Sequence, residues 1–502
     1  VKVIEDTLKG IVENGMDKKA LEAGINYHEF RYREADFGGY PKGLMYGLQI
    51  FDSWLYDETK PFIHVEALGT FAFLKEQIST GYFEKLIQTY LLDNQHGALV
   101  TIVPEPGRTA RLDAELKEKL QAYKESLSRE EIEKLVTDTK HLQEYQEEPS
   151  SQEDLEKIPM LTREDISREI APIYNEEMKI ADIPTVFHEI ETNGIGYLDL
   201  MFDLSDVPEK DLPMVGLLQA VLGIIDTEHY EYGELFNEIN RHTGGIGTSL
   251  ELYPDVTKVK EKEFKATFEI KGKALYGQIP FAIRMMKEIL TASKLDDEKR
   301  LKEILSMTKT RLQDRFLSAG HSAAALRAMS YKSPISKFKD TTNGIEYYQN
   351  IREMEEHFDE KKEEIISGLK ALSELLFRKG NVMISYTASR EGLAVLEEEI
   401  GSLKEALYPE RTPESRCILH CEKKNEGFKT SSKVQFAAKA GNFIDAGEEY
   451  NGALQILKVI MSYEYLWINI RVKGGAYGCM SNFNRIGEAI LYLTVDPNLG
   501  TT

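Results

Sequence analysis

Alternation of apolar and polar side chains predicts strands along the second half of the chain. Between Leu198 and Leu204 every second residue is apolar, which is the pattern of a strand with one buried face. Residues 264–270 repeat this alternation, and a further strand is expected near Val434–Ala438. In the first part of the chain, the apolar run Leu91–Val103 is predicted to be a strand that closes a mixed α/β region.

Apolar residues spaced by three or four positions predict amphipathic helices. Long helices of this kind are predicted over residues 294–317 and 350–378, within a region of alternating strands and helices. The more highly charged stretch 108–175 has the same helical spacing but no strand pattern. Inside it, Ser128 and Glu131 form a capping box, which starts a second helix. We therefore predict a helical hairpin that connects two larger bodies.

An internal repeat links the two bodies that follow the hairpin. In each copy a strand leads to an apolar helix, a break, a second helix, a glycine pair and another strand. The apolar helices are Pro213–Ile225 and Asn451–Met461, and the pairs are Gly244-Gly245 and Gly474-Gly475. A duplicated domain of about 220 residues would give this order. The alternative is a chance similarity between two α/β segments.

Composition and charge narrow the function. The 502 residues are 42% hydrophobic, which is ample for several cores. With 84 acidic and 62 basic residues the net charge is −22, so non-specific nucleic-acid binding is not expected. The acidic surface would favour basic peptides, or it serves solubility alone. No apolar run has the length of a membrane span. Three cysteines in a chain of this length indicate a reducing compartment.

The sequence holds few candidates for metal binding or nucleophilic catalysis. None of the ten histidines lies four residues from another, so neither histidine motif of the zinc peptidases is present. His28 and His188 each precede a glutamate, in segments that we expect to be strands. Cys417, His420 and Cys421 lack the fourth ligand of a structural zinc site. The alternative is a strand in which the cysteines are small apolar fillers.

A weak serine motif occurs at Gly320-His-Ser322. A nucleophile elbow needs a strand before the serine, whereas a helical pattern precedes this one. We therefore expect Ser322 to cap the following helix, and we keep a serine esterase only as a minor alternative.

The segment Arg471-Val-Lys-Gly-Gly-Ala-Tyr477 could act on a substrate. Its glycines permit a sharp helix end. An arginine keeps its charge and a tyrosine hydroxyl donates a hydrogen bond, so Arg471 and Tyr477 could together hold a peptide carbonyl as it becomes an oxyanion. Alternatively, Arg471 satisfies helix-end carbonyls and Tyr477 packs on a sheet.

The chain resembles a known family, the presequence proteases, which are a branch of the pitrilysin–insulysin metallopeptidases. The resemblance covers essentially the whole chain, and these stretches carry it: Glu29–Leu44, the charged hairpin through Ile158–Leu161, Thr243–Ile246, Gly320-His321, Asn425–Phe428 and Leu466–Gly478.

The resemblance implies an α+β fold of the LuxS/peptidase-like metallopeptidase type. Its domains are repeated two-layer units with mostly antiparallel sheets flanked by helices, and a helical hairpin joins two halves that close around a peptide chamber. It divides this chain into four parts: the C-terminal part of the second peptidase-like domain (1–107), the hairpin linker (108–175), the third domain (176–410) and a truncated fourth domain (411–502).

The resemblance also implies a function. The chain would be the non-zinc-binding C-terminal portion of a zinc metalloendopeptidase that degrades short unstructured peptides. Both ends of the sequence suggest that this chain is a piece of a longer protein. The zinc ligands would lie outside it, in the missing N-terminal half. That half would be the partner of this chain. In the third domain the equivalent helix carries Met214–Val221, which is apolar and cannot bind zinc. Arg471 and Tyr477 would reach the substrate carbonyl.

Two further expectations follow. We expect this chain alone to be inactive and to lie in the cytoplasm, or in an organelle matrix if its source is eukaryotic. The alternative from another class of protein is a non-catalytic scaffold or peptide-binding relative.

Overall fold

The chain folds into two compact units. The computed structural model describes residues 1–496 apart from 171, 413–415 and 433. Backbone contacts group Val1–Ile87 with the described residues from Tyr174 onward, and they separate Gln88–Ile173 as a smaller second unit. The predicted division into four domains is a finer one, and it stays a prediction.

The N-terminal part of the larger unit is helical. Its helices are α1 (Lys2–Asn14), α2 (Lys18–Glu34), α3 (Lys42–Trp54), α4 (Leu68–Gln77) and α5 (Tyr82–Ile87). The expected α/β mixture is therefore wrong here, and His28 lies on a helix rather than a strand. α2 packs against α10 (Tyr232–His242) in the sheet-bearing part of the same unit.

The predicted strand at Leu91–Val103 is also wrong. The chain leaves the π-helical turn η1 (Gln88–Leu92) and then has no regular structure up to Glu105. Leu99, Val100, Ile102 and Val103 are 74–91% exposed. A strand exists only through hydrogen bonds to a neighbouring strand, and in the part of the chain that the structure describes no strand pairs with this run.

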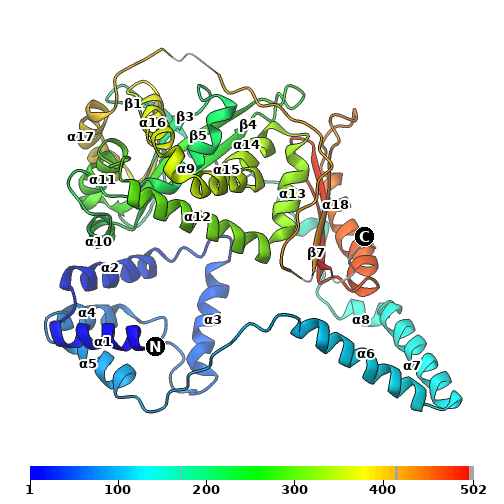
Figure 1. Ribbon diagram of the computed structural model, residues 1–502. Helices are drawn as coiled ribbons and strands as arrows, with labels where there is room; N and C mark the ends of the chain where they lie inside the picture. The colour runs from blue at the N-terminus through cyan, green and yellow to red at the C-terminus, as the bar shows by residue number, and fades with distance from the viewer. Residues whose placement is uncertain (171, 413–415, 433, 497–502) are drawn as a thin grey trace. The chain divides into compact units, whose positions relative to one another are not determined.

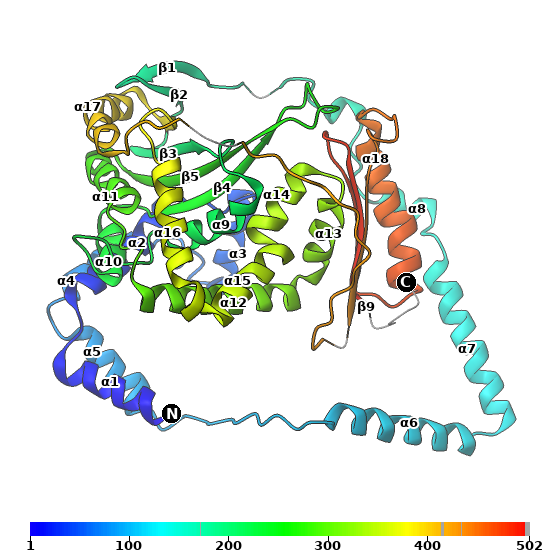
Figure 2. The ribbon, with the colours of Figure 1, turned by 45° about the horizontal axis from the view of Figure 1, so that its top comes forward.

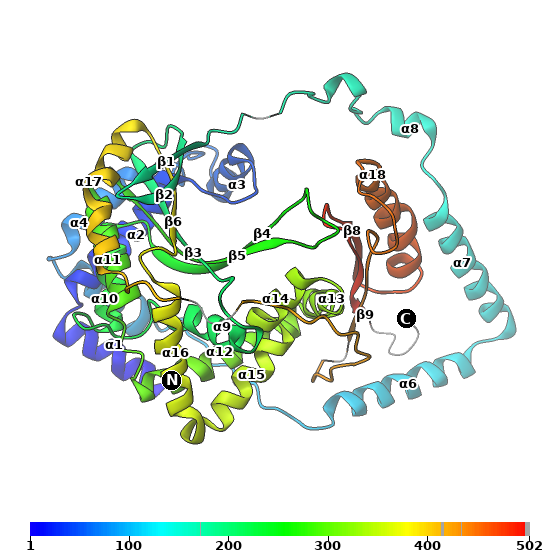
Figure 3. The ribbon, with the colours of Figure 1, turned by 90° about the horizontal axis from the view of Figure 1, so that it is seen from above.

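The second unit is built mainly of helices. They are α6 (Arg108–Ser126), α7 (Arg129–Glu147), α8 (Gln152–Glu156) and the short 3-10 helix η2 (Arg163–Asp165). The predicted capping box starts α7: the Ser128 hydroxyl accepts from the backbone of Glu131, and the Glu131 carboxylate accepts from the backbone of Ser128. α6 and α7 meet at a corner in all three views (Figures 1–3), so the predicted hairpin is an open one.

A six-stranded sheet organises the larger unit. Its strands are β1 (Glu176–Ile180), β2 (Ile183–Glu189), β3 (Ile195–Asp203), β4 (Ile246–Pro254), β5 (Phe264–Leu275) and β6 (Val382–Ala388). The order is β1-β2-β6-β3-β5-β4, and every neighbouring pair is antiparallel except β2 and β6. The strands predicted from alternation at Leu198–Leu204 and 264–270 are confirmed.

Helices cover the apolar face of this sheet (Figures 2 and 3). They are η3 (Glu209–Asp211), α9 (Leu212–Val221), α10, η4 (Tyr276–Gln278), α11 (Ile279–Thr291), α12 (Glu298–Ser318), α14 (Pro334–Asn343), α15 (Ile345–Glu356), α16 (Phe358–Leu376) and α17 (Arg390–Ala406). Between α12 and α14 in the chain, α13 (Gly320–Ser330) packs instead against the second sheet described below. Leu200, Phe268 and Ile384 are fully buried between the layers. The fold is thus the predicted α+β arrangement of mostly antiparallel sheets flanked by helices.

Two helix predictions need correction. The helix expected over 350–378 is interrupted at His357, where α15 ends and α16 begins. Ser322 is not a helix cap, because α13 begins at Gly320 and Ala319 precedes it. A Cβ at Gly320 would lie 2.3 Å from the ring of Phe436, so only glycine allows α13 to lie this close to β7.

A second, three-stranded sheet lies near the C-terminus. Its strands are β7 (Gln435–Asn442), β8 (Gly478–Phe483) and β9 (Glu488–Asp496), in the antiparallel order β7-β9-β8. α13 packs against β7 and β9, whereas α18 (Ala453–Ile460) and the π-helical segment η5 (Met461–Val472) pack against β8 (Figure 3).

The sheet order supports the predicted repeat. β3-β5-β4 in the first copy corresponds to β7-β9-β8 in the second, with the glycine pair before β4 in one and before β8 in the other. The copies differ in their helices. In the first copy α9 ends at Val221, earlier than predicted, and a break precedes α10. In the second copy the expected break is absent, because α18 continues directly into η5.

Candidate substrate-binding site

Arg471 lies in the last turn of η5, a π-helical segment. Such segments are rare and are frequent at functional sites. The helix is held to β8 by a small core of Leu466, Cys479 and Leu493, against which Trp467 also packs. The guanidinium of Arg471 lies 4.1 Å above the ring of Trp467. The arginine is therefore positioned by an aromatic face that is itself anchored in a core.

Tyr477 is a second aromatic residue close to the guanidinium. Its ring centroid is 5.2 Å from the guanidinium carbon of Arg471. Gly475 makes this approach possible, because its φ of 78° is left-handed and turns the chain back toward β8. The backbone N–H of Tyr477 donates to the carbonyl of Thr494 on β9, at 3.2 Å. The structure thus brings together the two residues that the sequence singled out.

Both polar groups of this pair are available to a ligand. The side chain of Tyr477 is 69% exposed. Among the described residues, no carboxylate forms an ion pair with Arg471 and no group forms a hydrogen bond with the Tyr477 hydroxyl. Arg471 itself is half-buried. A charged donor and a neutral donor that lie close together can bind a carbonyl or carboxylate oxygen.

Trp467 is the residue of this site that sequence reasoning missed. It stands four positions before Arg471, and this spacing alone could have indicated that the two share a helix face.

The other sequence candidates do not form a catalytic centre. Ser322 lies in the first turn of α13, which follows α12 rather than a strand. Residues 416–432 have no regular structure, so the expected strand around Cys417 and Cys421 is wrong. Burial raises the pKa of the Cys417 thiol to about 11, with a further contribution from Glu209, so this cysteine is a poor nucleophile at neutral pH.

α9 does not fit a zinc ion. Val215, Leu217 and Leu218 are fully buried in the core, and the side-chain amide of Gln219 donates to the backbone of Thr248. Zinc requires histidine, cysteine or carboxylate ligands, and none lies on this helix. Elsewhere among the described residues, no group of three such side chains is arranged to hold a metal ion.

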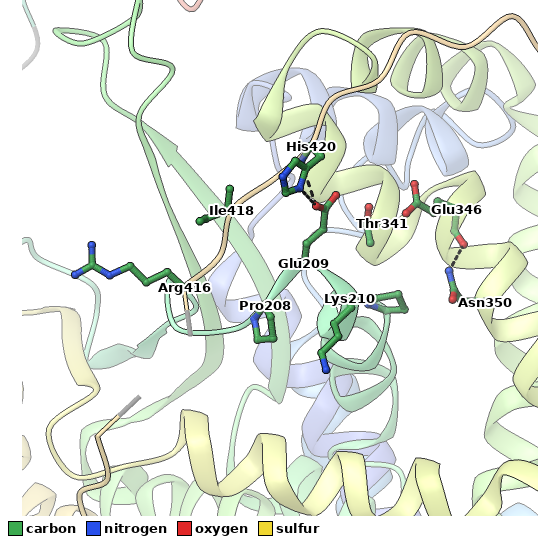
Figure 4. Close-up of a pocket in the computed structure, with 10 residues that line it drawn as sticks. Pro208, Glu209, Lys210, Thr341, Glu346, Asn350, Arg416, Ile418 and His420 are labelled. Carbon is green, nitrogen blue, oxygen red and sulfur yellow. Dashed lines mark hydrogen bonds and ion pairs between the residues drawn. The ribbon is translucent and has the colours of Figure 1, made fainter. Parts of the chain in front are cut away.

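The segment Arg416–Glu426, here called the strap, crosses the start of α9. The backbone N–H of Cys417 donates to the carbonyl of Ser205 at 2.7 Å, and Nδ1 of His420 lies 2.7 Å from the carboxylate of Glu209. Beneath the strap is a pocket of about 590 Å³, here called the strap pocket (Figure 4). Sequence reasoning singled out His420 but missed Glu209, because the pocket joins segments that are far apart in the chain.

Comparison with known proteins places the chain in a family. The family described as Peptidase M16C associated matches residues 102–354, which is half of the chain. The chain belongs to the M16C-associated peptidase family. The family described as PreP C-terminal domain matches residues 425–502, which include β7, η5 and the Arg471–Tyr477 pair.

Curated relatives of this M16C-associated chain are about twice its length. It is 39% identical over 501 residues to "Protein HypA" of Clostridium perfringens, covering 100% of this chain and 51% of that protein. It is 28% identical to "Presequence protease 1, chloroplastic/mitochondrial" of Arabidopsis thaliana, covering 99% and 46%. It is 24% identical to "Presequence protease, mitochondrial" of Yarrowia lipolytica, covering 100% and 50%. The resemblance to presequence proteases is thereby confirmed.

Among solved structures, a "peptidase M16 inactive domain from Pseudomonas fluorescens" aligns with 64% of this chain and 74% of that chain. The TM-score is 0.42 and the sequence identity is 15%. Over the described residues, no helix of the M16C-associated chain is both long and apolar enough to cross a membrane.

Proposed function

We propose that this chain is the non-zinc-binding C-terminal portion of a zinc metalloendopeptidase that degrades short unstructured peptides in a closed chamber. The observation that carries the proposal is the pair of half-buried Arg471 and exposed Tyr477. The guanidinium carbon lies 5.2 Å from the centroid of the tyrosine ring, and among the described residues no carboxylate pairs with Arg471 and no group bonds to the Tyr477 hydroxyl. Family membership supports the reaction class, and the printed names of the relatives support the substrate class.

The pair would act on the carbonyl of the scissile peptide bond or a neighbouring one. When water attacks that carbonyl, its oxygen gains negative charge. Donors that are already oriented toward this charge lower the barrier, because they need no reorganisation during the reaction. The Arg471 guanidinium would supply a fixed positive charge, and the Tyr477 hydroxyl would supply a neutral hydrogen bond.

Zinc would come from outside the described residues of this chain. When bound by the missing half, the ion would activate the attacking water. The role proposed for this chain is to bind the peptide and stabilise the carbonyl oxygen, and its partners are therefore the N-terminal half and the substrate peptide. The proposed compartment is the cytoplasm, or an organelle matrix if the source is eukaryotic.

Reconstitution tests this function. The chain alone is expected not to cleave a fluorogenic, unstructured peptide, and to restore cleavage when mixed with a separately produced N-terminal half. Because no covalent linker would join the pieces, association depends on their interface alone, and about micromolar or higher concentrations are expected to be needed.

Two outcomes contradict the proposal. Robust cleavage by this chain alone would refute the absence of a catalytic centre. A mixture that forms a stable complex, contains zinc and still cleaves no peptide would favour a non-catalytic scaffold.

A further inference from the structure

The strap pocket combines acidic groups with an apolar wall. Its carboxylates are Glu209 on η3 and Glu346 on α15, and its apolar side is formed by Pro208, Pro213 and Ile418. In Figure 4 the carboxylate of Glu209 points toward the strap, whereas the side chains of Lys210 and Arg416 are directed away from it. The basic residues at the rim therefore leave the acidic centre open.

The cations beneath the pocket are too few for its carboxylates. Lys337 lies 2.6 and 2.9 Å from the two oxygens of Glu346, but 3.7 Å from Glu209. Lys337 is thus shared between the two carboxylates and lies closer to Glu346 than to Glu209. Glu209 keeps a hydrogen bond from His420 through Oε2, which leaves Oε1 with only the distant lysine.

The second cation is shared still more widely. Arg327 forms ion pairs with Asp340, Glu346 and Glu426. Together with Lys337 it therefore faces four carboxylates, so this buried part of the cluster has two more acidic than basic groups, while Lys210 and Arg416 line the same pocket with their side chains directed away from it. Surplus charge in a partly buried site attracts a cation strongly, because solvent screens it poorly there.

A buried hydroxyl adds a third acceptor. Thr341 on α14 is 1% exposed, and its Oγ1 has no hydrogen-bond partner within the described structure. Thr341 also lines the strap pocket, and Figure 4 shows it beside Glu209 and Glu346. Buried polar atoms are almost always paired, so this hydroxyl points to a ligand group that completes it.

We propose that the strap pocket binds the primary ammonium group of a peptide. An ammonium has three donors, which match Glu209 Oε1, the Glu346 carboxylate and the Thr341 hydroxyl. The apolar wall suits the carbon chain next to the nitrogen, as in a lysine side chain or an N-terminal residue. The identification of the ligand as a peptide rests on the proposed function. The affinity of the pocket for an ammonium group can nevertheless be measured without catalysis.

Peptide binding to the 502-residue chain tests this. Four short Gly/Ser/Ala peptides with a fluorescent label at the C-terminus differ only in their amines: a free N-terminus, an acetylated N-terminus, an acetylated N-terminus with one lysine, and the same peptide with that lysine acetylated. Fluorescence anisotropy is expected to show binding at least about tenfold tighter for a peptide that carries an ammonium than for its acetylated counterpart. Comparison of the two peptides that carry an amine shows whether the pocket binds an N-terminal ammonium or a lysine ammonium.

Variants locate the binding in the pocket. Glu209→Gln is expected to weaken ammonium binding about tenfold, and Thr341→Val to weaken it by a smaller factor. The matched control is Glu360→Gln on the exposed side of α16, which is expected to leave affinity unchanged. His420→Ala releases the strap but keeps the Glu209 carboxylate, so binding should persist.

The proposal is overturned if acetylated and free peptides bind equally, if no peptide binds at millimolar concentration, or if His420→Ala reproduces the loss seen with Glu209→Gln. These results leave the proposed peptidase function standing, because cleavage by the reconstituted halves measures that function separately.

Discussion

At the scale of single residues, the Tyr477 hydroxyl gives the sharpest test of the substrate site. In the reconstituted enzyme, Tyr477→Phe removes one exposed donor and keeps the ring that packs beside Arg471. If the hydroxyl binds the developing oxyanion, kcat should fall roughly a hundred- to thousandfold, or about 2.7–4 kcal/mol. Steady-state kinetics measures this.

Controls separate this role from a structural one. Zinc content and melting temperature should match those of the parent, because Tyr477 is exposed and is not a ligand. Arg471→Lys keeps the charge but loses the planar guanidinium, so it should also impair cleavage. Near-parental turnover by Tyr477→Phe would end the assignment of that residue.

The contribution of Asp199, on β3, to the stability of the fold is expected to depend on pH. Burial is the largest influence on the pKa of Asp199; Lys271 opposes it, the charges of Glu269 and Glu251 add to it, and the pKa rises to about 6. Because this lies above the unfolded value, the folded state holds an extra proton between about pH 4 and 6. The contribution of Asp199 to stability therefore falls as pH rises through that window.

We expect Asp199→Asn to remove this dependence. The gain in unfolding free energy should be larger at pH 7.5 than at pH 4.5, by about 1–2 kcal/mol after allowance for solvent screening. Urea unfolding followed by circular dichroism at both pH values measures it. Asp314→Asn, on the solvent side of α12, is the control. A pH-independent difference between Asp199→Asn and the parent would contradict the mechanism.

At the scale of secondary-structure elements, close packing fixes α9 against its neighbours. A Cβ at Gly216 would lie 2.4 Å from the backbone oxygen of Thr342 and 2.7 Å from the ring of Tyr347. Gly216→Ala should therefore destabilise the fold by about 1–3 kcal/mol despite the better helix propensity of alanine.

Gly233 on α10 provides the matched comparison. Nothing lies within 4 Å of a Cβ built there, so Gly233→Ala should stabilise the protein by about 0.4–1 kcal/mol. Thermal melting of the two variants should shift in opposite directions. A shift of both in the same direction would show that propensity, not packing, decides at Gly216.

The elements also show what the sequence could predict. The alternation of apolar and polar residues predicted β3 correctly, because one face of that strand is buried and the other is mostly polar. The same reasoning failed at Leu91–Val103, because apolar composition does not show whether a neighbouring strand exists. The Arg471–Tyr477 pair was found through its motif. The strap pocket was not, because Glu209, Thr341 and Glu346 meet only through tertiary packing.

At the scale of the whole molecule, the exposed segment 93–105 should be the first site of limited proteolysis. It has no regular structure and its apolar side chains face solvent, which makes its backbone accessible to a protease. A cut there separates α1–α5 covalently from the sheet, but both belong to one compact unit.

The N-terminal fragment should therefore stay bound after the cut. Glu34 pairs with Lys273 at 2.7 Å, the side-chain amide of Asn26 donates to the carbonyl of Arg241, and the ring of Phe30 lies against Gly244. Size-exclusion chromatography should show co-elution of both fragments. Lys273→Glu places a like charge beside Glu34 and should promote release, whereas Lys332→Glu should not. Separation of the parent fragments would show that these contacts are too weak to hold the unit together.

The position of β6 in the large sheet has a consequence for biosynthesis. β6 pairs with both β2 and β3. In the sequence, however, most of the domain lies between the end of β3 at Asp203 and the start of β6 at Val382. At about 5–20 residues per second, the stretch between them takes roughly 10–40 s to translate. During that interval β2 and β3 each present an unpaired edge to other nascent chains. The ribosome-bound intermediate is therefore the form of this protein most exposed to aggregation, and the form most in need of a chaperone.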